Sequence, residues 1–142
     1  MNRAALRETV FKILFRYEFH DVDSFKDQIE LFFNEYPQNS DDDEDWPRLN
    51  EKSVVEITER VADLLSYIEE IDEKIKECCT GWKLERIGKT ELSIMRVAVY
   101  EIFFDDNIDV AVAISEAVKL SKKYCDEKSH SFVNGVLAKF AK

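Results

Sequence analysis

The side chains best suited to chemistry lie around one turn near the C-terminus of the chain. Lys122 and Lys123 precede Tyr124, and Lys128 stands directly before Ser129. Lysines bind phosphate groups, and aromatic rings stack on the unpaired bases of single-stranded RNA. The first turn of a helix also offers backbone N–H groups to a phosphate, and the last helix is expected to begin near Lys128. One interpretation of this turn is therefore an RNA site.

A structural interpretation of the same residues stays open. Lys122 and Lys123 are expected at the end of a helix, where cations offset the helix dipole. Phe132, which lies beyond the turn, fits the apolar stripe of the last helix, so the hydrophobic core is the simpler place for it.

Charge is distributed unevenly along the chain. Thirty acidic and twenty basic residues give a net charge of -10, which taken alone disfavours nucleic acid as a partner. Residues 1–20 hold four basic and two acidic groups, residues 21–80 hold six and nineteen, and residues 81–142 hold ten and nine. The excess of acidic residues thus lies in the middle of the chain, and both ends carry a small net positive charge. An RNA site built from the two ends is compatible with this composition.

No arrangement of residues indicates an enzyme or a metal site. Cys125 precedes His130 by five residues, but no activating or oxyanion-binding group accompanies them. The remaining cysteines and histidine, Cys78, Cys79 and His20, complete no zinc-ligand spacing. Three glycines are too few for a glycine-rich nucleotide loop. We expect no cofactor, no small-molecule substrate and no membrane span, and a cytoplasmic location.

The length and composition favour a single all-α domain. A chain of 142 residues with three Gly and two Pro lacks the turns of a β-sandwich or barrel. Apolar residues at helical spacing predict helices over residues 3–20, 25–36, 50–79 (with room for one break), 84–87, 92–102, 110–123 and about 129–140. The helix over 92–102 is hydrophobic almost throughout, and we expect it at the centre of the core.

An acidic segment separates the second predicted helix from the third. Residues 38–49 include the run Asp41 to Asp45, followed by Trp46 and Pro47. Because adjacent like charges repel, a solvated loop is expected here, with an acidic docking segment as the alternative.

Four blocks in the second half of the chain are recognisable. They read WKLERI, IMRVAVYE, VAISEAV and SHSFVNGVL, at residues 82–87, 94–101, 112–118 and 129–137. Together with the start Arg3-x-x-x-Arg7-Glu8 they resemble the NusB family of bacterial transcription antitermination factors. The same helical module precedes the catalytic domain of certain ribosomal RNA cytosine methyltransferases. This chain ends at Lys142, so no such domain is expected.

The resemblance implies an all-α protein of about seven helices in two subdomains, without enzymatic activity. It implies pairing with NusE, a small-subunit ribosomal protein, binding of boxA RNA, and a role in the RNA polymerase antitermination complex of ribosomal RNA operons. The RNA contacts it implies are Arg3, Arg7, Lys122, Lys123, Lys128, Ser129 and Phe132. The partner contacts it implies are Glu91 and Glu85. Arg96 is compatible with either the core or the RNA edge.

This sequence departs from the family pattern in several places. The first helix is usually richer in arginine, so weaker RNA binding with a shallower salt dependence is expected. Lys128 stands where many relatives carry an acidic residue, which makes the turn less repellent to RNA. Ser115 replaces a common Asn, and Asp109 a common Pro. An acidic helical protein–protein adaptor with the NusB fold and little RNA binding is the alternative function.

Overall fold

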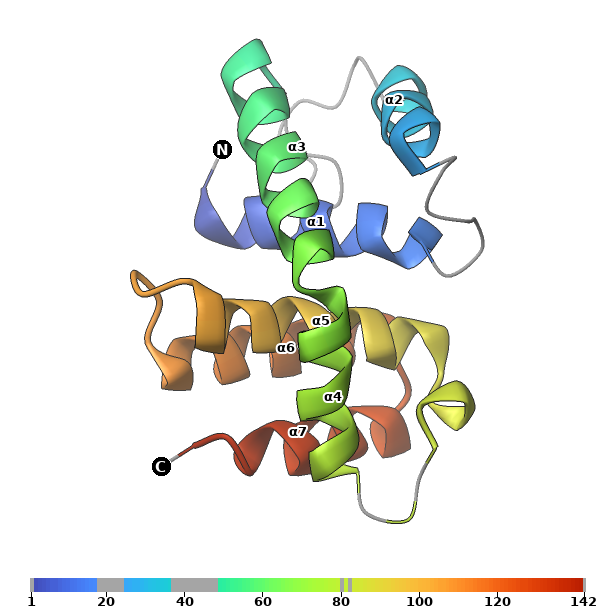
Figure 1. Ribbon diagram of the computed structural model, residues 1–142, viewed down its shortest axis with the longest axis vertical. Coiled ribbons are helices and arrows are strands. Elements are labelled where there is room, and N and C mark those ends of the chain that lie inside the picture. The colour runs from blue at the N-terminus through green and yellow to red at the C-terminus, as the bar shows by residue number, and fades with distance from the viewer. Residues whose placement is uncertain (1, 18–24, 37–48, 80, 82, 142) are drawn as a thin grey trace. The chain divides into compact units, whose positions relative to one another are not determined.

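The computed structural model describes residues 2–17, 25–36, 49–79, 81 and 83–141. Within these ranges there are seven α-helices, one short 3-10 helix and no strand (Figure 1), which confirms the all-α fold class. They are α1 (Arg3–Tyr17), α2 (Phe25–Glu35), α3 (Glu51–Ser66), α4 (Ile68–Cys78), η1 (Leu84–Arg86), α5 (Lys89–Phe104), α6 (Val110–Tyr124) and α7 (Glu127–Ala138). The predictions for residues 18–20, the acidic run Asp41 to Asp45 and Trp82 lie outside the described residues.

The helix ends follow local capping rules. Asn2 caps α1, its side-chain Oδ1 accepting the backbone N–H of Ala5 at 2.7 Å. Asn50 caps α3 in the same way, accepting the N–H of Ser53 at 2.8 Å. Both asparagines thus satisfy a backbone N–H group that the start of a helix leaves without an intrahelical partner.

The long apolar stretch predicted over residues 50–79 is broken once, at Tyr67. This residue lies between α3 and α4 with φ -109° and ψ 12°, and its ring stacks on Phe104 of α5 with ring centroids 4.0 Å apart. The stack holds the start of α4 against the end of α5.

The chain divides into two compact units, Met1–Asp63 and Leu64–Lys142, here called the N-terminal and C-terminal units. In the N-terminal unit, Phe32 of α2 and Tyr36, which directly follows α2, are buried. Arg16 of α1 forms an ion pair with Glu35 of α2 at 2.8 Å and lies over the ring of Phe32, 5.4 Å from its centroid. These contacts join the C-terminal turns of α1 and α2.

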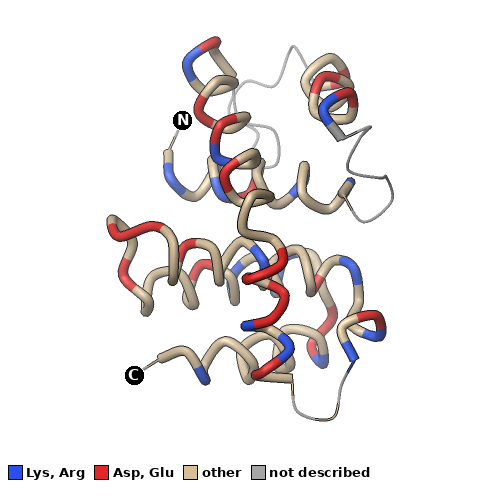
Figure 2. Tube along the Cα trace, viewed as in Figure 1, with Lys and Arg blue, Asp and Glu red and all other residues tan. Residues whose placement is uncertain are grey.

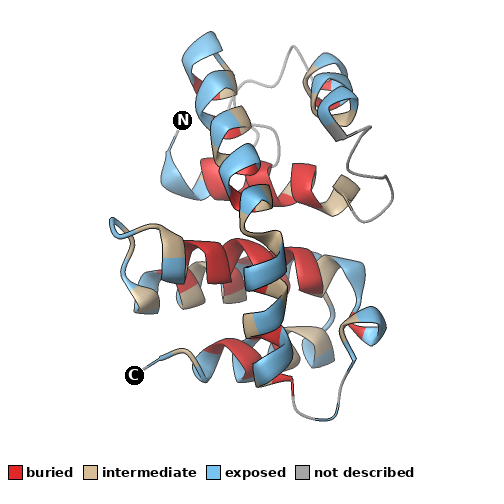
Figure 3. Ribbon diagram, in the orientation of Figure 1, coloured by how far each residue is buried: buried red, intermediate tan, exposed pale blue. Residues whose placement is uncertain are grey.

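In the C-terminal unit, α5 is the central helix. Every residue from Leu92 to Glu101 is buried, and α4, α6 and α7 all pack against this helix. Figure 3 shows α5 buried over most of its length. A helix that is hydrophobic on nearly all sides needs partners on nearly all sides, so the central position predicted for this segment is confirmed.

A buried ion pair connects α5 to α4. The guanidinium of Arg96 donates two hydrogen bonds to the carboxylate of Asp72, from Nε at 2.8 Å and from Nη2 at 2.9 Å. The Arg96 side chain is only 6% exposed, so this bidentate partner compensates for the loss of hydration. Of the two interpretations of Arg96, the structure supports the core.

Substitution of Asp72 by Ala should destabilise the protein by about 3 kcal/mol, because it leaves the buried Arg96 guanidinium without its carboxylate. Urea unfolding at pH 7 measures the change. The matched control is Glu35→Ala, which removes an ion-pair partner with a 63% exposed side chain and should cost less than about 1 kcal/mol. Equal losses in the two variants would show that the Arg96–Asp72 pair does not support the core.

Candidate nucleic-acid interface

The predicted RNA turn lies where α6 ends and α7 begins. Lys122 and Lys123 are exposed in the last turn of α6, and Lys128 is exposed in the first turn of α7. Tyr124 has 36% of its surface exposed, and the ammonium of Lys123 lies 5.6 Å from the centroid of its ring. The turn thus brings three cations and an accessible aromatic ring together, the groups that bind phosphates and stack on bases.

The start of α7 is occupied by a side chain of the protein itself. The carboxylate of Asp126 accepts the backbone N–H of Ser129 at 2.8 Å. This bond, then one from the Ser129 hydroxyl, lowers the pKa of Asp126, and the charge of Lys128 adds to the effect. The N–H group of Ser129, one of those that the first turn of the last helix would offer to a phosphate, is therefore already satisfied. A phosphate at this turn would be bound by lysine side chains.

Ser129 and Phe132 lie half-buried in the first two turns of α7. Phe132 is neither enclosed in the core nor presented as an open platform. Tyr124, on the other side of the turn, offers the more accessible ring.

The two arginines of α1 differ in exposure. Arg3 is exposed in the first turn, where no acidic residue is present and where a cation is disfavoured by the helix dipole. Arg3 therefore does not stabilise the helix through its charge, and helix stability does not explain an arginine at this position. Arg7 is only 7% exposed and is engaged by other groups, so the structure does not present it as the solvent-facing phosphate ligand that the resemblance implies.

The predicted sites belong to both units of the chain. Arg3 and Arg7 lie in the N-terminal unit, whereas the lysines of the turn, Ser129 and Phe132 lie in the C-terminal unit. The structure brings the C-terminal group together around one turn. Arg3 and Arg7 both belong to α1.

Of the two predicted partner contacts, Glu85 is exposed in η1 and Glu91 is half-buried in the first turn of α5. The carboxylate of Glu91 folds back over Gly88 and fills the space that a side chain at position 88 would need. Glu91 also accepts a hydrogen bond from the thiol of Cys125. The start of α5 is thereby connected to the turn between α6 and α7.

The contact between Cys125 and Glu91 could not be anticipated from the sequence. Burial, followed by the hydrogen bond and the negative charge of Glu91, raises the pKa of Cys125 to about 12. The thiol therefore stays protonated and acts as a hydrogen-bond donor. Nothing local to either residue signals the pairing, because helix packing alone brings them together.

The described part of the chain shows no cluster of three or more His, Cys, Asp or Glu side chains able to hold a metal ion. None of its helices is long and apolar enough to cross a lipid bilayer.

Comparison with known proteins gives consistent results. A sequence profile of the NusB family matches residues 4–142. The transcription antitermination protein NusB of Agathobacter rectalis is 44% identical over 141 residues, covering 99% of this chain and 100% of that protein. The NusB protein of Lachnoclostridium phytofermentans is 38% identical, covering 98% of each chain.

Two solved structures are similar to this one along nearly the whole chain. NusB of T. maritima gives a TM-score of 0.77 at 27% identity, covering 99% of this chain and 91% of that one. A complex of the antitermination factors NusB and NusE with dsRNA gives a TM-score of 0.71, also at 27% identity, covering 97% and 94%.

Iodoacetamide should label Cys125 at pH 8.5 roughly a hundredfold more slowly in the folded chain than in urea, because the folded thiol remains protonated. The substitution Glu91→Gln should speed the labelling of Cys125, since it removes the charge that helps to raise the pKa. Peptide mass spectrometry distinguishes Cys125 from the other cysteines. The control Glu85→Gln changes an exposed carboxylate in η1 and should leave the rate unaltered; equal effects of both variants would disprove the Cys125–Glu91 contact.

The cap at Asp126 should make stability depend on pH. Its pKa is lowered from 3.8 in the folded chain, so its ionised form stabilises the protein above about pH 3.8, and this contribution is lost as the pH falls through the lower folded value. The variant Asp126→Asn, which can still cap the helix, should be less stable than the parent at pH 6. The gap between them should close towards pH 2.5 in urea unfolding, and a gap independent of pH would refute the charged cap.

Proposed function

The chain belongs to the NusB family of transcription antitermination proteins, and we propose that it performs this function by pairing with a NusE-type ribosomal protein and holding boxA RNA. One structure to which it is similar contains NusB, NusE and dsRNA together. The observation that carries the proposal is the exposed group of Lys122, Lys123 and Lys128 at a single turn, in a chain whose net charge is -10.

The basic side chains have a positioning role in this proposal. The three lysines of the turn, with Arg3 of α1, contact phosphates and therefore hold the RNA without reading its sequence. Base selectivity comes from Ser129, from stacking on Tyr124 or Phe132, and from the surface shared with the partner. Arg7, being buried, contributes to the packing of α1.

The partner contact is assigned to Glu91 and Glu85. Both carboxylates lie in the C-terminal unit, one at the start of α5 and one in η1. They offer negative charge to a basic ribosomal protein. The carboxylate of Glu91 already lies over Gly88 before the partner arrives, which reduces the entropy lost on binding.

We assign the protein a binding role with no catalytic step, carried out in the cytoplasm with the RNA polymerase antitermination complex. The alternative is an adaptor that pairs with proteins and binds RNA weakly, which the acidic composition and the burial of Arg7 favour.

Fluorescence anisotropy of boxA RNA should show tighter binding when this chain and NusE are both present than with either alone, and weaker binding of a scrambled RNA. With about four phosphate contacts, from the three lysines and Arg3, the logarithm of the binding constant should fall with a slope of roughly -3 against the logarithm of salt concentration. Lys128→Ala should reduce the magnitude of that slope by about 0.7. It should weaken the binding of boxA RNA and of the scrambled RNA to a similar extent, since phosphate contacts carry no sequence information.

The matched control is Lys52→Ala, which removes an exposed lysine from α3 and should leave RNA binding unchanged. NusE binding without any preference for boxA would replace this proposal by the adaptor. Equal effects of Lys52→Ala and Lys128→Ala would remove the turn from the RNA interface.

A further inference from the structure

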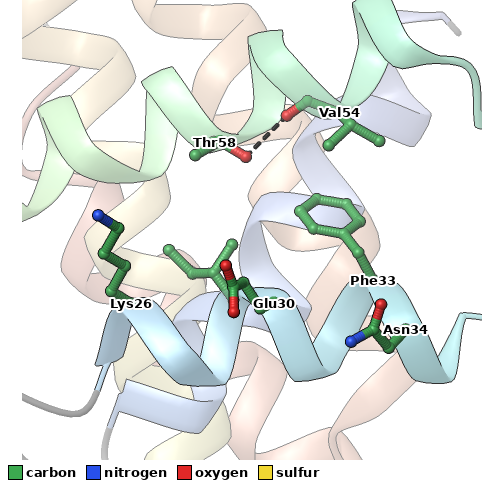
Figure 4. A pocket seen from close by; sticks show the side chains of 7 residues that line it. Lys26, Glu30, Phe33, Asn34, Val54 and Thr58 are labelled. Atoms are coloured by element: carbon green, nitrogen blue, oxygen red, sulfur yellow. Dashed lines mark hydrogen bonds between the residues drawn. The ribbon is translucent and has the colours of Figure 1, made fainter.

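A groove with a volume of about 540 Å³ lies between α2 and α3 in the N-terminal unit (Figure 4). Ile29 and Phe33 of α2 and Val54 of α3 give it an apolar lining. Lys26 and Glu30 line it from successive turns of α2. Its size is within the range of roughly 300–1,000 Å³ that is usual for ligand pockets.

The lining is separate from the buried faces of both helices. On α2, Phe32 is buried, while Ile29 and Phe33 remain half-exposed. On α3, Val54 is half-exposed and its neighbour Val55 is 54% exposed. Apolar area left in water forgoes about 25 cal/mol per Å², so covering this face would be favourable.

The two helices that form the groove are acidic overall. α2 and α3 together carry seven acidic and three basic side chains, a net charge of -4 (Figure 2). Of the two charged residues that line the groove, Lys26 is basic and Glu30 is acidic, and Glu51 adds a second carboxylate one helical turn before Val54. An apolar floor with an acidic surround attracts cations and repels phosphates.

We propose that the groove between α2 and α3 is a docking site for a basic amphipathic helix of another protein. The apolar side chains of such a helix would cover Ile29, Phe33 and Val54, and its Lys or Arg residues would pair with Glu30 and Glu51. The assignment rests on the shape of the groove and on charge complementarity. It is independent of the RNA turn, which uses none of these residues.

The test uses the full-length chain, labelled with ¹⁵N, and a synthetic amphipathic peptide of leucine and lysine at helical spacing. Backbone amide signals of Ile29, Phe33 and Val54 should shift on titration. The same peptide with glutamate in place of lysine should bind at least tenfold more weakly, because the surround is acidic.

Two variants assign the binding to the groove. Val54→Lys places a charge on the apolar floor and should weaken binding of the leucine–lysine peptide at least tenfold. The matched control Val112→Lys makes the same change at a 47% exposed valine of α6 and should leave the affinity within twofold of the parent. Glu30→Lys alters only an exposed side chain and should weaken binding at least threefold even if Val54→Lys perturbs folding.

Several results would overturn the proposal. Equal binding of the lysine and glutamate peptides would remove charge complementarity, and equal effects of Val54→Lys and Val112→Lys would place the contact elsewhere. Absence of peptide binding to the full chain would mean that the groove is not accessible to a partner. If the amide signals of Ile29, Phe33 and Val54 shifted on titration with boxA RNA and did not shift with the peptide, the occupant of the groove would be a nucleic acid.

Discussion

The guanidinium of Arg96 is the constraint on which the C-terminal unit depends. A charge on a helix as buried as α5 requires a partner with matching geometry, and the bidentate contact with Asp72 determines which face of α4 packs there. The stack of Tyr67 on Phe104 fixes the same two helices at a second point. With α4 held in place, the remaining apolar surface of α5 is covered by α6 and α7.

This arrangement positions the candidate interface. Because α6 and α7 are both packed on α5, the turn that joins them is held at both ends, and its lysines are presented by rigid helices. Glu91 lies close enough to Cys125 to raise the pKa of that thiol, so the same turn lies beside the first turn of α5. The proposed RNA contacts and the proposed partner contact are thus neighbours within the C-terminal unit.

The sequence was sufficient to predict features that depend on short-range order. Helical periodicity located the helices, and the continuous hydrophobicity of residues 92–102 identified the central one, since both follow from backbone geometry. The cap at Asp126 was missed although the signal is local: an Asp three residues before Ser129 satisfies the rule for an N-cap. The burial of Arg7 and the contact between Cys125 and Glu91 depend on how helices pack, which no local pattern encodes.

The separation of charge along the chain explains how an acidic protein can present an RNA site. At physiological ionic strength the Debye length is about 8 Å, so a phosphate responds to the charges around it and hardly to the net charge of -10. At the turn, the three lysines outnumber the two exposed acidic side chains, Asp126 and Glu127, so its local net charge is positive. The acidic side chains of α2 and α3 repel RNA from their own surface, and repulsion from wrong surfaces contributes to specificity as much as attraction to the right one. The acidity of the middle of the chain is thus compatible with RNA binding and restricts where on the protein it can occur.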